Sequence, residues 1–246
     1  MDLKLLKSML SSTIEKIGWD NKLAEWIKLW DDDTVDAICL QSSTEEDQRE
    51  TIDNGAYDQR IKKLLRNVRS VNGNPLDVKV YISDEVNAFA FPHNAIRIYS
   101  GLMDCLKDNE LIAIIGHEIG HIVHHDTRKQ MRYELAVSIG RDVLKSTRYG
   151  QLLPELVGQI TERYLDSHYS RNAEEKADDY GCEFAISQGY SPTSMADALD
   201  VFVRLEEGEK SSLIERMFAS HPDSKDRADR LRAIGDKRIR QLNGDY

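Results

Sequence analysis

The chain has 246 residues, enough for one large or two small domains. A hydrophobic content of 40% and ordinary Gly and Pro contents exclude collagen-like, low-complexity and wholly disordered chains. With 33 Lys and Arg against 43 Asp and Glu, the formal net charge is −10. This charge excludes the basic surface of a general nucleic-acid-binding protein and disfavours contact with an anionic membrane. We therefore expect no nucleic-acid partner.

Targeting and membrane signals are absent from the sequence as given. No stretch approaches the roughly 20 apolar residues of a spanning helix, so no transmembrane segment is predicted. The N-terminus has no signal-peptide pattern, which predicts a cytoplasmic protein. A sequence trimmed of a signal would look the same, and would be periplasmic or membrane-associated. Cys39, Cys105 and Cys182 are far apart and odd in number, which predicts buried free thiols.

The N-terminal part has two amphipathic helix patterns, over residues 2–17 and 19–30, and holds all three tryptophans. It is interpreted either as a helical hairpin packed on the main domain or as a surface that docks a partner or a membrane. Residues 31–58 follow with ten acidic residues and one arginine, nine of the ten net charges. We predict a linker up to residue 43 and a helix that begins at Thr44 as its N-cap. The predicted domains are a helical extension with an acidic linker, 1–43, and a main domain, 44–246.

The main domain combines a few strands with many helices. A helix over 60–70 is predicted to stop at the turn over residues 72–75. Alternating or short apolar runs predict strands near 78–82, 88–90 and 95–99. Helices are predicted over 101–107, 109–125, 127–146, 151–166, 170–188, 192–207 and 223–241. This order predicts a mostly helical α+β fold.

The sequence HEIGH over residues 117–121 is an HExxH motif on a predicted apolar helix. Because residues four apart share one helix face, His117 and His121 can bind one Zn²⁺. Glu118 lies beside them and can take a proton from metal-bound water. Buried polar groups without partners cost about 1–3 kcal/mol each, and a metal removes that cost. The alternative is a helix with hydrogen-bonded core histidines.

A catalytic zinc needs a third protein ligand and one open position. Glu174 and Asp178 are four residues apart on the next predicted helix. Glu174 can bind the zinc, while Asp178 accepts a hydrogen bond from the far nitrogen of a zinc-bound histidine. Otherwise these carboxylates, with Glu175 and Asp179, form a solvated helix face.

Further motifs surround the HExxH box in a fixed order. They are VNAFA over 86–90, YSGLM over 99–103, DNEL over 108–111, YSR over 169–171, GYSP over 189–192 and SHP over 220–222. With these motifs the sequence resembles the HtpX and CAAX-prenyl-endopeptidase family of gluzincin metallopeptidases, from about Glu46 to Leu231. It is most similar to the soluble bacterial branch, which includes outer-membrane lipoprotein peptidases.

The resemblance implies a zincin-type fold, in which the edge strand of a small sheet flanks the cleft between an HExxH helix and a second ligand helix. It also implies one Zn²⁺ per chain, bound by His117, His121 and Glu174, with Glu118 as the general base. By the same resemblance, Asn87 lies on the edge strand that pairs with the substrate backbone.

Two C-terminal residues take their expected roles from the resemblance alone. His221 would steady the oxyanion of the tetrahedral intermediate, or approach the zinc and hold the site shut. Arg227, six residues later, would contribute to substrate binding. His221 before Pro222 is otherwise a helix-entry residue.

The sequence departs from the family in four places. His93 lies in a Pro92-His93-Asn94 turn where relatives usually have Pro-Gly-Gly; it would lie near the cleft or in an exposed loop. Asp126 replaces a common histidine, the lipoprotein signal is absent, and residues 1–43 have no recognised counterpart.

The sequence therefore predicts a zinc endopeptidase that cleaves extended or unfolded protein segments, in keeping with the family's role in protein quality control. The alternative is a catalytically inactive, chaperone-like peptide-binding module that keeps the zinc fold. Latency is a third possibility, with His221, His93 or residues 1–43 holding the site closed.

Overall fold

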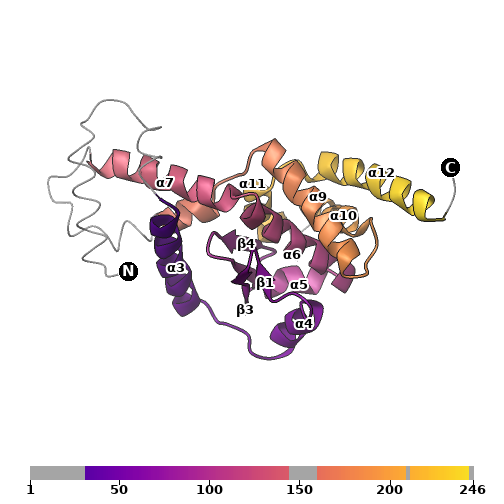
Figure 1. Cartoon of the computed structure of the whole chain (residues 1–246), viewed down its shortest axis with the longest axis horizontal. Helices are drawn as coiled ribbons and strands as arrows, with labels where there is room; N and C mark the ends of the chain where they lie inside the picture. Colours follow the sequence, from indigo (N-terminus) through magenta and orange to yellow (C-terminus); the bar gives the residue numbers. More distant parts are fainter. Residues whose placement is uncertain (1–30, 144–159, 209–210, 244–246) are drawn as a thin grey trace.

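The computed structural model describes residues 31–143, 160–208 and 211–243 of the chain (Figure 1). Its helices are Asp32–Arg49 (α3), Ala56–Leu64 (α4), Ser100–Cys105 (α5), Asp108–Val123 (α6), Asp126–Val143 (α7), Arg171–Ser187 (α9), Ser194–Glu206 (α10), Ser211–Ser220 (α11) and Ser224–Asn243 (α12), with a helical stretch over residues 160–165. Its strands are Ser70–Val71 (β1), Asn74–Pro75 (β2), Asp77–Tyr81 (β3), Ala88–Phe91 (β4) and Ala95–Tyr99 (β5). The predicted mostly helical α+β class is confirmed.

The main sheet has three strands in the order β3-β5-β4. The central strand β5 is parallel to β3 and antiparallel to β4, so β4 has one neighbour among the described strands and is an edge strand of this sheet. A three-residue turn joins β4 to β5, and Asn94 adopts a positive φ of 62° there, which asparagine tolerates better than most residues. The Asn94 side chain donates to the carbonyl of Val71 at 2.8 Å and fixes the turn.

The two faces of the sheet are covered by different helices (Figure 1). Because side chains alternate along a strand, Ala88, Ala90, Ile96 and Ile98 face the main hydrophobic core, which includes α6. The opposite face carries the aromatic side chains of β4 and packs against α3, α7 and residues 160–165.

Helix α3 is anchored to this second face by a buried ion pair. The guanidinium of Arg97 on β5 donates to both carboxylate oxygens of Asp47, at 2.8 and 3.0 Å. Lys79 and the hydroxyl of Tyr81 donate to the same carboxylate. Val35 on α3 is fully buried. Helix α3 is therefore part of the packed domain.

The helix pair α6 and α9 forms the centre of the molecule and carries the candidate site. Almost every residue of α6 is buried, and the helix packs most extensively against α9. Glycines allow this close approach: a Cβ on Gly181 would lie 2.7 Å from the carbonyl oxygen of Ala113, and one on Gly116 would lie 2.8 Å from Phe184. Small residues at the crossing thus bring the two helix backbones together.

Several sequence predictions about the elements are wrong. The predicted linker up to residue 43 is helical, because α3 begins after Asp31, whose side chain caps the amide of Thr34. Thr44 is therefore inside this helix and does not cap it. The helix predicted over 60–70 ends at Leu64, since the chain turns into the β1–β2 hairpin. Helix α11 was not predicted.

Other predictions fall on parts of the chain that are not described. The N-terminal helix patterns, with Trp19, Trp26 and Trp30, lie outside the described residues, as does most of the helix predicted over 151–166. Among the described helices, none has the length and apolar character needed to cross a membrane. The cysteines Cys39 and Cys182 are buried free thiols, as predicted, while Cys105 is half-buried.

Candidate active site

The HExxH motif lies in the second half of α6, with its three polar side chains buried in the core. Their spacing puts His117 and His121 one helical turn apart on one face. Their Nε2 atoms lie 3.1 Å from each other. This convergence brings the two Nε2 atoms to one point, where a single metal ion could bind both.

Helix α9 supplies a carboxylate to the same point. Ser170 caps the start of α9, and Glu174 follows in its first turn, only 1% exposed. Its Oε1 lies 3.3 Å from Nε2 of His121, and its Oε2 lies 3.7 Å from Nε2 of His117. The structure thus brings together the three residues predicted as zinc ligands.

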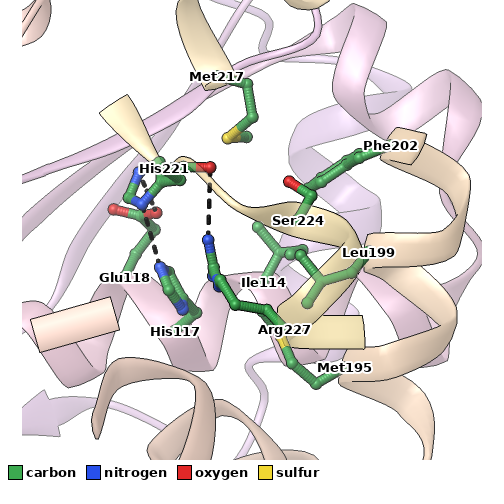
Figure 2. Close-up of a pocket in the computed structure, with 10 residues that line it drawn as sticks. All are labelled: Ile114, His117, Glu118, Met195, Leu199, Phe202, Met217, His221, Ser224 and Arg227. Atoms are coloured by element: carbon green, nitrogen blue, oxygen red, sulfur yellow. Dashed lines mark hydrogen bonds and ion pairs between the residues drawn. The ribbon is translucent and has the colours of Figure 1, made fainter. Parts of the chain in front are cut away.

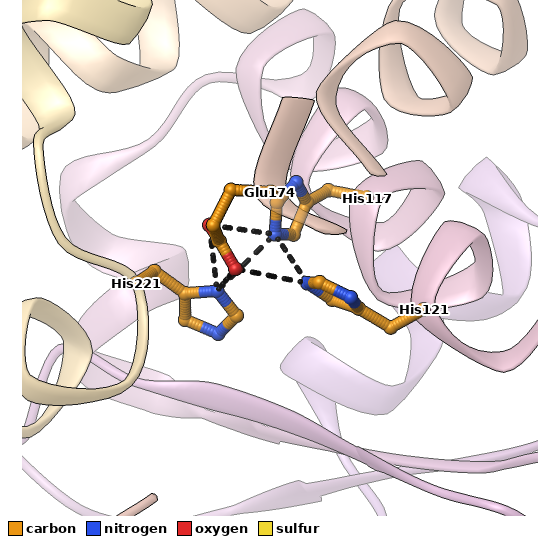
Figure 3. Close-up of side chains that lie close together, drawn as sticks. All are labelled: His117, His121, Glu174 and His221. Carbon is orange, nitrogen blue, oxygen red and sulfur yellow. Dashed lines mark hydrogen bonds and ion pairs between the residues drawn. The ribbon is translucent and has the colours of Figure 1, made fainter. Parts of the chain in front are cut away.

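His221, which directly follows α11, completes the cluster (Figure 3). Its Nδ1 lies 3.2 Å from Nε2 of His117 and 3.0 Å from Oε1 of Glu174. The four side chains each offer a ligand atom, and these atoms lie within 4.8 Å of one another. Three imidazoles and one carboxylate match the nitrogen and oxygen ligands that Zn²⁺ accepts. The buried cluster is therefore compatible with a bound metal ion.

A second layer of carboxylates orients the imidazoles. Oδ1 of Asp178 lies 3.0 Å from Nδ1 of His117, and Oδ2 of Asp126 lies 3.5 Å from Nδ1 of His121. A carboxylate at the far nitrogen fixes the ring and leaves Nε2 free to bind a metal. The structure places Asp178 at the far nitrogen of His117, and its role in orienting a zinc-bound histidine stays a prediction.

The electrostatics of the cluster favour a positive charge at its centre. Burial lowers the pKa of His117 to about 4, which keeps this imidazole neutral. Burial also disfavours the charged form of His121, yet Asp126 and Glu174 raise its pKa to about 9. A site that draws a proton onto one of its imidazoles also attracts a metal cation.

Glu118 lies beside the cluster at the wall of a small pocket (Figure 2). Burial raises the pKa of its carboxyl. Its Oε1 lies 3.6 Å from Nε2 of His221 and has no hydrogen-bond partner among the described residues. The pocket is lined by Ile114, His117, Glu118, Met195, Leu199, Phe202, Met217, His221, Ser224 and Arg227. An ionisable group with a raised pKa in such a pocket is suited to moving a proton.

Arg227 is buried behind the ligands. Its guanidinium donates to both oxygens of Asp178, and its Nη1 lies 2.6 Å from Oε2 of Glu174. Burial opposes ionisation of Asp178, but the hydrogen bonds from Arg227 and His117 lower its pKa to about 2. These contacts suit a positioning residue, and the substrate-binding role of Arg227 stays a prediction.

Two other predicted residues lie outside the cluster. Asn87 directly precedes β4, its backbone carbonyl accepts from the amide of Tyr99, and its side-chain Oδ1 has no partner within the described part of the chain. His93 is half-buried, with its Nε2 3.1 Å from Oγ of Ser43 on α3 and its ring stacked on Phe91. It is therefore neither in the metal cluster nor in an exposed loop.

Sequence reasoning gave no role to Asp126, which lies against His121, and it missed Tyr169. The ring of Tyr169 stacks on that of His121, with 3.9 Å between centroids and 17° between planes. Tyr169 opens the YSR motif, just before the N-cap of α9. The motif marks the segment, but nothing in the sequence pattern indicates which side chain the ring contacts.

Comparison with known proteins is consistent with this geometry. Residues 52–235 match peptidase family M48. The metalloprotease LoiP of Escherichia coli is 35% identical over 206 residues, which cover 82% of this chain and 80% of LoiP. The metalloprotease YcaL of the same organism is 33% identical over 179 residues, 72% of this chain and 69% of YcaL. The protease HtpX of Nitrosococcus oceani is 26% identical over 211 residues, 70% of each chain.

These similarities confirm the family that the sequence motifs predicted. The match includes the HExxH helix, Glu174 and His221, the residues that the structure brings into one buried cluster. The chain therefore belongs to peptidase family M48 and is a metalloendopeptidase.

Proposed function

We propose that the protein is a zinc-dependent endopeptidase that hydrolyses peptide bonds in extended or unfolded protein segments. The observation that carries this proposal is the position of Glu118, a buried carboxylate whose Oε1 has no hydrogen-bond partner among the described residues, beside a cluster of four metal-ligand side chains. A purely structural metal site needs no such base.

In this proposal His117, His121 and Glu174 hold one zinc ion. Bound there, the ion would supply an acidified water and polarise the substrate carbonyl. Glu118 takes the proton from the attacking water and delivers it to the leaving amine. Burial raises the pKa of this carboxyl, which makes Glu118 a stronger base toward the water.

Residues around the site have supporting roles. Asp178 orients His117, and Arg227 holds Asp178 and Glu174 in place. Asn87 and strand β4 are proposed to bind the substrate backbone, because an edge strand offers unpaired amide groups to an extended peptide.

The edge strand β4 supports an unfolded substrate. Only a segment without secondary structure of its own has free backbone groups that can pair along β4, so an extended or unfolded chain is the form that this edge can bind.

Latency is a further part of the proposal. His221 reaches the ligand cluster with Nδ1 and Glu118 with Nε2, so it is placed either to close the site or to steady an oxyanion. For the N-terminal segment, a deletion of residues 1–43 would remove buried α3 residues such as Val35 and Ile38. Deletion of residues 1–30 is the sharper test, and increased activity is expected if they inhibit.

The decisive experiment compares the wild type with Glu118→Gln. We expect one zinc per chain in both, measured by elemental analysis, and loss of casein cleavage in the variant. The matched control is Glu175→Gln, which makes the same change on α9 outside the cluster and should keep activity. If the zinc-loaded wild type does not cleave casein, the peptidase proposal is wrong and the alternative, a chaperone-like peptide-binding module, is favoured.

A further inference from the structure

The outer edge of β4 carries the backbone groups that an extended substrate needs. The carbonyl of Asn87 accepts from Tyr99 on β5, so it points into the sheet. Backbone groups alternate in direction along an antiparallel strand, which turns the carbonyls of Ala88 and Ala90 toward the free edge. A peptide that adds to this edge would donate its N–H groups to them.

One of these two acceptors is already occupied. The hydroxyl of Tyr164 donates a hydrogen bond to the carbonyl of Ala90. Tyr164 is 5% exposed, and its ring stacks on Phe91 of the same strand at 5.9 Å and 24°. The side chain therefore covers the edge strand where a substrate backbone would pair.

The same tyrosine is linked to the metal cluster. The oxygens of the Tyr164 and Tyr169 hydroxyls lie 3.3 Å apart. Because Tyr164 uses its only proton on Ala90, Tyr169 must be the donor of this bond. The ring of Tyr169 stacks on His121, so the tyrosine pair, Tyr164 and Tyr169, connects the edge strand to a ligand residue.

We propose that Tyr164 controls access of the substrate backbone to strand β4: a substrate pairs at Ala90 only after its N–H displaces the Tyr164 hydroxyl from the Ala90 carbonyl. The inference rests on the proposed function, since it assigns β4 to peptide binding. Without a peptide, the tyrosine satisfies a buried carbonyl that would otherwise be costly to leave unpaired. When a peptide binds, its N–H replaces the Tyr164 hydroxyl as the donor to the Ala90 carbonyl. The arrangement without peptide is therefore stable, and it is reversible.

The test is peptide affinity in the zinc-loaded Glu118→Gln protein, where no cleavage interferes. A fluorescein-labelled, unstructured casein-derived peptide is titrated with the Glu118→Gln protein and with the same protein carrying Tyr164→Phe. Removal of the competing hydroxyl should lower Kd by about threefold to tenfold, the equivalent of one ordinary hydrogen bond. In the active enzyme, Tyr164→Phe should lower KM by a similar factor and leave kcat unchanged.

Tyr81→Phe is the matched control. Tyr81 belongs to the same aromatic cluster, and its buried hydroxyl donates to Asp47 instead of to the edge of β4. This variant also loses a hydrogen bond of a buried tyrosine, but the Ala90 carbonyl stays covered. Its peptide Kd should equal that of the parent. An equal gain in affinity in both variants would overturn the proposal, since it would reflect general loosening.

The outcomes separate this inference from the proposed function. If the wild type cleaves casein but Tyr164→Phe binds the peptide no more tightly, the role of Tyr164 is wrong and the peptidase stands. If neither the wild type nor Tyr164→Phe cleaves casein but Tyr164→Phe binds the peptide more tightly, the role of Tyr164 is supported and the peptidase function is not. Should Tyr164→Phe fail to fold, Tyr169→Phe is titrated instead. It removes the proton donated to the Tyr164 oxygen, which makes the Tyr164 hydroxyl a weaker donor to Ala90, so a small decrease in Kd, of no more than about twofold, is expected. An increased Kd in that variant would contradict the proposal.

Discussion

Arg227 and Asp178 form a two-point ion pair directly behind the metal-ligand cluster. Nε of Arg227 donates to Oδ2 of Asp178 at 2.9 Å, and Nη2 donates to Oδ1 at 2.6 Å. The same guanidinium contacts Glu174 through Nη1. Since Asp178 also lies against His117, a single buried arginine holds one carboxylate of the cluster and the group that orients one of its imidazoles.

The first prediction concerns this pair. Arg227→Met should destabilise the protein by about 3–5 kcal/mol in urea unfolding, because it removes the buried positive charge that pairs with the carboxylates of Asp178 and Glu174. Arg227→Lys should lose less stability than Arg227→Met, because lysine keeps the positive charge but cannot form the two-point contact with Asp178. As a control, Arg238→Met breaks an exposed pair with Glu183 between the same two helices and should cost no more than about 1 kcal/mol. Similar losses in both variants would contradict the role of Arg227.

A second prediction concerns the crossing of α6 and α9. Gly181→Ala places a Cβ 2.7 Å from the backbone oxygen of Ala113 and 3.1 Å from the amide nitrogen of His117. Both atoms belong to the backbone of α6, which can move away only at a cost in free energy. Glycine to alanine in a helix normally gains up to about 1 kcal/mol, but we expect overpacking to reverse the sign and cost about 1–3 kcal/mol.

The same substitution should move Glu174 with α9 and weaken zinc binding, measured by competition with a chelator. Lys176→Ala is the control, since it changes an exposed position of the same helix and should leave stability and zinc affinity unchanged. Normal stability of Gly181→Ala would show that the helices have more room than the structure gives them.

A third prediction concerns the pH dependence of stability. Burial of Asp47 opposes its ionisation, but hydrogen bonds from Arg97, Lys79 and Tyr81 outweigh it and lower the pKa below the ordinary 3.8. A folded-state pKa below the unfolded value stabilises the fold above about pH 4, and this stabilisation is lost as the pH falls through the folded-state pKa.

Asp47→Asn should therefore be less stable than the wild type at pH 7, and the difference should shrink below pH 4. Thermal unfolding from pH 7 to pH 3 checks this. A difference that stays constant with pH would mean that the charge of Asp47 does not stabilise α3 on the sheet.

The fourth prediction concerns His221 as a metal ligand. His221→Ala should still bind one zinc per chain, because three ligand side chains remain, but with an affinity at least about tenfold lower. Loss of an outer hydrogen-bond partner already costs about 10–100-fold, and Nδ1 of His221 lies inside the cluster. His124→Ala, outside the cluster, should leave the affinity unchanged. An unchanged affinity in His221→Ala would restrict His221 to the oxyanion role.

The error over residues 31–43 shows where composition misleads. Ten acidic residues between 31 and 58 favoured a solvated linker. In the structure, one face of α3 buries Val35, Ile38 and Cys39, which are spaced as neighbours on a helix. The acidic residues of α3 are not among its buried residues. Asp36 pairs with Arg128, and Asp47 with Arg97. Asp36 and Asp47 therefore have partners in distant elements, which a count along the chain does not reveal.

The sequence by itself determined the chemistry of this protein and the local geometry of its motif. The spacing of His117, Glu118 and His121 needs only one helix to become a metal site, and that helix is specified by its own apolar residues. The same holds for the three strands of the main sheet, which are marked by local alternating or apolar runs.

Tertiary structure decided what lies around the motif. Nδ1 of His221 meets His117 across 104 residues of sequence, and the hydroxyl of Tyr164 meets Ala90 across 74. Such contacts depend on how helices and strands pack, through small residues such as Gly181 and buried pairs such as Arg227 with Asp178. Periodicity reports which face of an element is buried, but the partner on that face is chosen by close packing and by charge pairing in the core.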